Sequence, residues 1–282
     1  MDHPEIFGQR IAGIISINNF LANDSKQVLG ENITKDENKK PFVVAVFGDS
    51  YVFGAGVRNE QVFPLLLEKK LNRIRPTKVL SFALSGDTIF DNYEKYKIIQ
   101  EMGVQPNVVV FGLVNNDLLL SPLKWAPSPT IYTRFSVESS NIFNGCTGEI
   151  IRQEDGDSYE RDVSAPFEVD TLNYCGFLKT LTLLPKEKAI YFNFWDVNLE
   201  PDTRMEKLIA GLSSKGLHIV TPLKEFKKYL GNNNDKISEV PAFHVSKLDF
   251  HPSAVSHELF AESLFQEITS NTDYQFMQIK QN

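Results

Sequence analysis

The sequence predicts an α/β/α sandwich, in which a mostly parallel, flavodoxin-like sheet is covered by helices on both faces. Apolar runs of strand length alternate along the chain with longer segments of helical periodicity, which is typical of parallel sheets with crossover helices. The first of these runs, 42–47, is apolar at every position, as expected for a strand buried on both faces. With 282 residues, 42% of them hydrophobic, the chain can fill a core of this size.

The individual elements follow in order. We expect a helix after residue 59, where apolar residues recur at helical spacing and Pro64 is tolerable near the first turn. Gly103 ends the next predicted helix. The predicted strands are 42–47, 79–84, 108–114, 189–195 and 218–220, and the further helices are 88–102, 202–212 and 253–268.

Two segments depart from this rhythm and define the domain organisation. Residues 1–40 are predicted to form an N-terminal helix and a polar linker, followed by one domain over 41–282. Residues from about 121 to 170 hold four prolines and an acidic stretch, and we expect an insertion there. It can form a cap over a functional site or a solvent-exposed loop remote from the chemistry, because long loops in compact domains are usually functional or disordered.

Charge and composition exclude several classes of protein. Acidic residues outnumber basic ones by 36 to 29, for a net charge of −7, which argues against nucleic acid as a partner. No run approaches the roughly 20 apolar residues of a membrane-spanning helix. Cys146 and Cys175 lack metal-ligand spacing, and both a disulfide and two free thiols remain open.

The N-terminal apolar run 11–17 follows acidic residues rather than the positive charge of a signal peptide. The cytoplasm is therefore the default compartment, and the periplasm or secretion remains open if a leader has been removed.

Ser50 is the candidate nucleophile. Gly48-Asp49-Ser50 follows the first predicted strand, and the carboxyl ends of strands are where parallel sheets carry their sites. A serine needs an adjacent base, and that base needs a group to orient it. The alternative for Ser50 alone is a turn with an N-capping serine.

Asp249 and His251 are the candidate orienting acid and base. One residue separates them just before the last predicted helix, so in an extended segment both side chains project to the same side. The carboxylate can then hold one imidazole nitrogen while the other faces outward. The alternative is a loop histidine beside a surface acid.

Two further strand ends offer donors for an oxyanion. Gly86 follows the second strand, where a glycine lets a ligand approach the backbone N–H. Asn116 follows the third strand and carries a side-chain amide, with Asn115 as an adjacent competitor.

These motifs and their order resemble the GDSL-type esterases, or SGNH hydrolases. The run FGDSYVFGAGV at 47–57 is similar to the first family block, Gly86 to the glycine of the second, Asn116 to the asparagine of the third, and DFHPSA at 249–254 to the fifth. The resemblance implies an SGNH hydrolase fold over 41–282, with a triad of Ser50, His251 and Asp249. It also implies an oxyanion hole of the Ser50 N–H, the Gly86 N–H and the Asn116 amide.

The activity that the resemblance implies is hydrolysis of a carboxylic ester, without cofactor or metal. The substrate would be a small-molecule or glycan ester, such as an acetyl or short acyl ester of a carbohydrate or lipid. An O-acyltransferase that uses a sugar hydroxyl and a non-catalytic carbohydrate-binding relative are the alternatives, and the oligomeric state stays open. We expect structural roles for the remaining histidines, namely His3, His218, His244 and His257.

Overall fold

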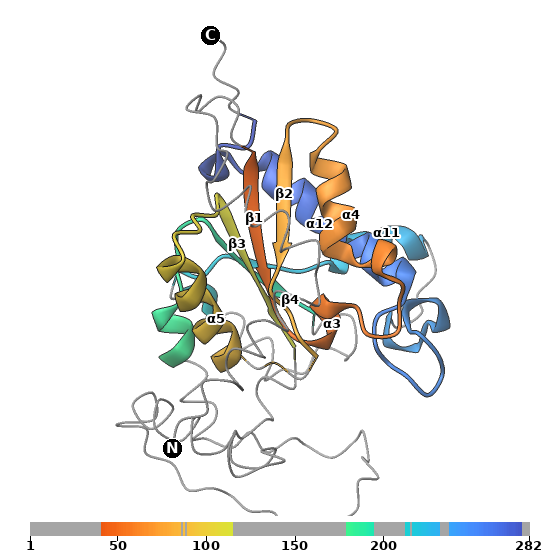
Figure 1. Ribbon diagram of the computed structural model, residues 1–282. Coiled ribbons are helices and arrows are strands. Elements are labelled where there is room, and N and C mark those ends of the chain that lie inside the picture. Colours follow the sequence, from red (N-terminus) through yellow and green to blue (C-terminus); the bar gives the residue numbers. More distant parts are fainter. Residues whose placement is uncertain are drawn as a thin grey trace, which may run out of the picture.

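The protein is built on a five-stranded parallel sheet with the strand order β2-β1-β3-β4-β5. The computed structural model describes residues 41–85, 87, 89–114, 179–194, 212–214, 216–231 and 237–277. The strands are β1 (Phe42–Phe47), β2 (Thr77–Ser81), β3 (Val108–Leu113), β4 (Ala189–Asn193) and β5 (Ile219–Val220). All of them run the same way, so their carboxyl ends meet at one edge (Figure 1).

Helices cover both faces of the sheet. On one side lie α4 (Phe63–Leu71), α12 (Ala254–Ser270) and α11 (Leu223–Leu230), and on the other lies α5 (Ile89–Glu101) (Figure 1). Alternate residues of β1 serve the two layers: Val44 and Val46 belong to the core with α4 and α12, whereas Ala45 and Phe47 belong to the core with α5. This two-residue alternation confirms the predicted three-layer α/β/α sandwich.

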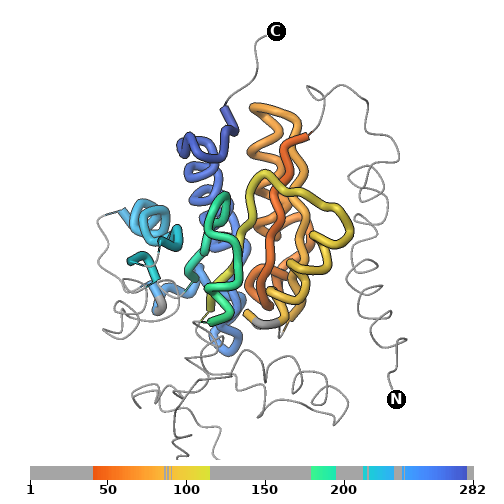
Figure 2. Tube along the Cα trace, turned by 90° about the vertical axis from the view of Figure 1, so that its left-hand side faces the viewer, coloured from red at the N-terminus to blue at the C-terminus, as the bar shows by residue number. Residues whose placement is uncertain are grey.

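The two ends of the sheet are far apart in the fold. In Figure 2, the cyan segment that holds α11 lies on the opposite side of the molecule from the orange and yellow segments of β1, β2 and α5. The strand order accounts for this separation, because β5 precedes α11 directly and β2 forms the other edge of the sheet.

The observed elements shift some of the predicted boundaries. β2 starts at Thr77 rather than at residue 79, because the side chain of Asn72 bonds both the N–H and the C=O of Thr77 (2.9 Å each) and fixes the strand's first residue. Residues 59–61 form a 3₁₀ turn, η2 (Asn59–Gln61), before α4 begins with Pro64 in its first turn. The remaining short elements are α3 (Ser50–Phe53), η3 (Ile237–Glu239), η4 (Pro241–Phe243) and η5 (Thr272–Tyr274).

Several predicted segments lie outside the described residues. These are the N-terminal helix and linker at 1–40, the insertion at 121–170 and the helix at 202–211. Among the described residues, no helix combines the length and apolarity that a membrane crossing requires.

A buried histidine joins the two helices of one layer. The fully buried ring of His257 on α12 accepts a hydrogen bond through Nδ1 from the N–H of Phe63 (3.2 Å), the first residue of α4. An N–H in the first helical turn has no acceptor within its own helix, so His257 supplies one. Burial lowers the pKa of His257 to about 4, and the ring therefore stays neutral at physiological pH.

His257 makes the fold sensitive to acid. Its pKa lies below the ordinary value of 6.5, so the unfolded chain takes up the proton first and stability falls as pH drops from 6.5 toward 4. We expect His257→Asn to remove most of this loss, about 3 kcal/mol in the unfolding free energy, because the amide oxygen can still accept from Phe63. Urea denaturation at pH 7 and pH 4 measures it. Equal losses in both proteins would contradict this role.

Candidate active site

Ser50 begins a short helix at the carboxyl end of β1. Asp49 caps α3: its Oδ1 accepts a hydrogen bond from the Tyr51 N–H (2.9 Å), as aspartate commonly does at a helix start. In one orientation, the buried Ser50 hydroxyl can donate its single proton to Oδ2 of the same carboxylate (3.3 Å). Asp49 thus fixes both the turn and one orientation of the serine side chain.

Two glycines let this helix lie directly on the end of the sheet. A Cβ added at Gly48 would come within 2.2 Å of Cγ2 of Val52 on α3, and one added at Gly112 on β3 would come within 2.7 Å of the same atom. Val52 is itself buried. Side chains at positions 48 and 112 would therefore displace α3, and with it Ser50.

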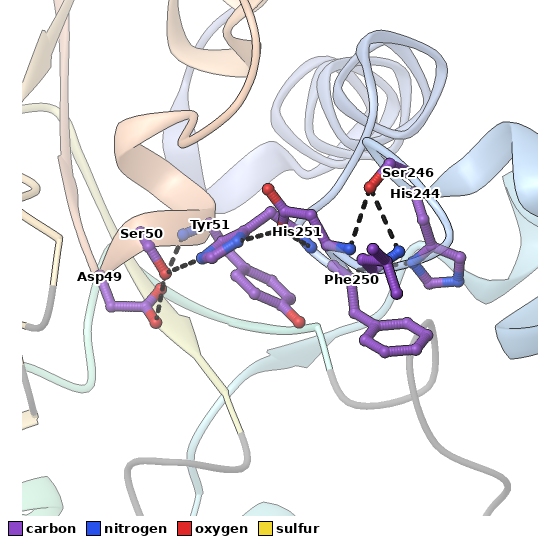
Figure 3. A network of polar contacts seen from close by, with 9 residues as sticks. Asp49, Ser50, Tyr51, His244, Ser246, Phe250 and His251 are labelled. Atoms are coloured by element: carbon purple, nitrogen blue, oxygen red, sulfur yellow. Dashed lines mark hydrogen bonds and ion pairs between the residues drawn. The ribbon is translucent and has the colours of Figure 1, made fainter.

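His251 faces Ser50 from the loop before α12. Its Nε2 lies 3.0 Å from Ser50 Oγ, and its Nδ1 lies 2.6 Å from Oδ1 of Asp249 (Figure 3). The same carboxylate oxygen accepts the backbone N–H of His251 (3.0 Å). Serine, imidazole and carboxylate therefore form one continuous chain of hydrogen bonds, although Ser50 and His251 lie 201 positions apart in the sequence.

Backbone and side-chain hydrogen bonds hold the loop that carries His251. The hydroxyl of Ser246 accepts from the N–H groups of Leu248 (3.2 Å) and Asp249 (3.1 Å) (Figure 3). The C=O of His251 accepts from the N–H of Val245 (2.9 Å). These contacts close a tight loop, so Asp249 is positioned by the local backbone as well as by its partner.

His244 stabilises the N-terminal end of the same loop. Its Nδ1 lies 3.2 Å from the C=O of Phe250, and its ring contacts the Phe250 ring edge-on. An antiparallel bridge between His244 and Pro252 closes the loop at its base. His244, for which the sequence predicted a structural role, therefore has such a role close to the candidate base His251.

The electrostatics of the site favour an ionised Asp249 carboxylate and a protonated Tyr51 hydroxyl. Hydrogen bonds from the backbone N–H and then the side chain of His251 lower the pKa of Asp249, which keeps the carboxylate charged near neutrality. The ring of Tyr51 packs edge-on against His251, with 5.9 Å between ring centres. Burial, aided by Asp49 and Asp249, raises the pKa of Tyr51, so its hydroxyl stays protonated.

The structure brings together Ser50, His251 and Asp249 of the predicted site residues. Gly86, Asn116 and its competitor Asn115 lie outside the described residues, as do Cys146, Cys175 and His3. His218 lies elsewhere and pairs with Glu267 (2.8 Å). In the described part of the chain, no group of three or more His, Cys, Asp or Glu side chains could hold a metal ion.

The supporting roles of Asp49 and Ser246 were not predicted from the sequence. Asp49 had a usable signal, because an acid directly before a helix start is a strong N-cap candidate. Ser246 had a weaker one, since serine in a loop often bonds the backbone two or three residues on.

Comparisons with known proteins add similarity in solved structures. No family model and no curated protein matches the chain. A member of the lipolytic protein G-D-S-L family from Veillonella parvula DSM 2008 matches with a TM-score of 0.44 and 10% identity, over 81% of this chain and 99% of its own. The lipase/acylhydrolase from Enterococcus faecalis matches with a TM-score of 0.44 and 17% identity, over 80% and 94%.

TesA matches with a TM-score of 0.45 and 14% identity, over 80% of this chain and 97% of its own.

We expect Gly48→Ala to lower any turnover that depends on Ser50 at least tenfold. The added methyl meets Val52 at 2.2 Å, and overpacking of this kind typically costs about 1–3 kcal/mol while displacing α3. Val52→Ala in the same chain removes the nearest atom and should restore part of the activity.

Gly103→Ala is the control for this variant. Gly103 follows the C-terminal end of α5 and has a positive φ of 79° with open space around it, so alanine there costs about 1–2 kcal/mol of backbone strain. Equal activity losses in Gly48→Ala and Gly103→Ala would show that the close approach to Val52 does not matter for the site.

Proposed function

We propose that this protein is a serine ester hydrolase that acts through an acyl-enzyme intermediate. The observation that carries the proposal is the hydrogen-bonded chain from Ser50 Oγ through His251 to Asp249, with 3.0 Å and 2.6 Å between the bonded atoms. Both distances are within reach for proton transfer and for orientation of the base.

Acylation begins when Ser50 Oγ attacks the ester carbonyl carbon. Nε2 of His251 accepts the hydroxyl proton, and the carbonyl electrons move to oxygen. When the tetrahedral intermediate collapses, the C–O bond to the alcohol breaks and His251 returns the proton to the departing alkoxide. Asp249 holds Nδ1–H toward itself throughout, so Nε2 is the nitrogen that accepts.

Deacylation repeats these steps with water. His251 takes a proton from a water molecule, the resulting hydroxide attacks the acyl carbon, and collapse releases the carboxylic acid and the Ser50 hydroxyl. A sugar hydroxyl in place of water would transfer the acyl group instead, and the same site residues would serve.

The oxyanion would be held by three donors. Ser50 lies in the first turn of α3, where backbone N–H groups have no intrahelical acceptor, so its own N–H is one. The resemblance to the GDSL-type family supports the N–H of Gly86 and the side-chain amide of Asn116 as the others, with Asn115 as the competing amide.

Apolar side chains beside the base support an ester with an apolar portion. Leu248 and Phe250 flank Asp249 in the chain, and their exposed fractions are 95% and 63%. A short acyl ester of a carbohydrate or lipid is the proposed substrate class. A panel of p-nitrophenyl esters of increasing chain length measures the preference.

A fluorophosphonate probe tests the nucleophile directly. We expect the wild-type protein to be labelled on the peptide that contains Ser50, as identified by mass spectrometry, and to hydrolyse p-nitrophenyl acetate. Ser50→Ala should lose both properties and keep its thermal unfolding midpoint.

Ser270→Ala is the matched control, because Ser270 is an exposed serine at the end of α12. Turnover by Ser50→Ala close to the wild-type rate would rule out Ser50 as the nucleophile.

The role of Asp249 is tested by Asp249→Asn. In the wild type, the lowered pKa of Asp249 keeps the carboxylate ionised in the neutral range, where it holds Nδ1–H of His251. The variant should lose at least about 10²-fold in kcat/KM, because the amide no longer fixes the tautomer in which Nε2 accepts the proton.

Asp273→Asn, a change at an exposed acid in η5, should keep the wild-type kcat/KM. Near-normal activity of Asp249→Asn would assign the orienting role to another group.

A further inference from the structure

A buried ionic contact lies near the end of β2, outside the Ser50–His251–Asp249 chain. Lys95 on α5 forms an ion pair with Asp87, and both side chains are buried. Neither residue has a part in the proposed chemistry. Asp87 directly follows Gly86 in the chain.

Both members of the pair bind the backbone that follows β2. Asp87 Oδ2 accepts the N–H of Leu84 (2.7 Å), and Lys95 Nζ donates to the C=O of Phe82 (2.9 Å). The pair therefore bonds to two backbone groups of one three-residue segment, and it connects that segment to α5.

The same segment is attached to β1 on its other side. The N–H of Phe82 donates to the C=O of Val46 (2.8 Å), and the N–H of Leu84 also lies 3.3 Å from the C=O of Gly48. The Phe82 ring stacks on Phe47, with 5.1 Å between centres. One residue separates Gly48 from Ser50, so the hydrogen bond from Leu84 links the segment that the ion pair holds to the backbone beside the serine.

Stability alone is a weak reason for this pair. Desolvation of two buried charges often exceeds their mutual attraction, and apolar replacements of similar volume are frequently neutral or stabilising. Burial raises the pKa of Asp87 to about 7 even though Lys95 lowers it, so the cost of burial is not fully offset here. A role in geometry accounts for the pair better.

We propose that Asp87 and Lys95 are positioning residues that hold the backbone from Phe82 to Leu84 against the end of β1, and so fix the chain that leads to Gly86, the residue whose N–H the proposed function uses. The inference rests on the proposed function for its catalytic consequence. The geometric part stands on the contacts of Phe82 and Leu84.

Lys95→Met tests the catalytic consequence, because methionine keeps much of the volume and removes the charge. We expect kcat for p-nitrophenyl acetate to fall at least tenfold with KM within twofold of the wild type, since a misplaced donor acts on the transition state. The rate of fluorophosphonate labelling should fall in parallel.

Two lysine variants control for charge loss and for lost stability. Lys97→Met removes a more exposed ion pair, with Glu94, from the same helix. Lys70→Met removes the ion pairs with Glu258 and Glu262 on the opposite face of the sheet. Both should keep kcat within twofold of the wild type, even where the melting temperature falls as far as in Lys95→Met.

The conservative change at Asp87 separates positioning from bulk stability. Asp87→Asn keeps an oxygen that can accept from Leu84, whereas Asp87→Ala loses it, so the asparagine variant should retain clearly more of kcat than the alanine variant. Losses of kcat that simply follow melting temperature across all five variants would overturn the proposal.

Amide hydrogen exchange tests the geometric part without any activity. In Lys95→Met, the Leu84 N–H should exchange at least tenfold faster than in the wild type, while the N–H of Tyr191 on β4 stays protected. Unchanged Leu84 exchange overturns the proposal. Failure of wild-type labelling at Ser50, together with faster Leu84 exchange in the variant, would refute the proposed function and leave the positioning of the segment supported.

Discussion

The close approach of α3 to the end of the sheet is the constraint on which the site depends. Val52 lies where side chains at Gly48 and Gly112 would otherwise be, so the first turn of α3 rests on the backbones of β1 and β3. Ser50 is held at the carboxyl edge by this contact and by the Asp49 cap. A serine in a more distant turn would not meet His251 at 3.0 Å.

The two halves of the site are held by different physical means. The serine half depends on packing, because glycine and a buried valine set the distance between helix and sheet. The histidine half depends on hydrogen bonds within a short loop, where Ser246 and Asp249 bond nearby backbone N–H groups. Few of the loop's stabilising contacts are apolar, so polar substitutions there act on geometry more than on the core.

Much of the fold could be predicted because buried parallel strands are recognisable in the sequence as short, continuous apolar runs. β1 and β3 agree with their predicted ranges to within one residue. α11 was not predicted, since its sequence LKEFKKYL is rich in lysine and buries Glu225 together with Phe226, and its place is decided by α12. The start of β2 likewise depends on the side chain of Asn72, a contact that no periodicity reveals.

The candidate site likewise has some residues that local sequence patterns indicate and other contacts that only the folded structure reveals. The spacing of Asp249 and His251 and the position of Ser50 after a strand were readable, because each is a local pattern. The pairing of Asp87 with Lys95 was not, since each residue alone reads as an ordinary polar position before or within a helix. Which charge is buried against which backbone carbonyl depends on how α5 packs on the sheet.

The position of α12 in the chain has a consequence for how the protein is made. This helix supplies a large part of one core layer, joins α4 through His257 and directly follows the loop with His251. A nascent chain therefore carries its serine long before it carries the base and the helix that completes the layer, and contacts between such distant segments form late and slowly. Under the proposed function, reactivity and final packing would arise together, because a chain that ends before His251 lacks the base that activates Ser50.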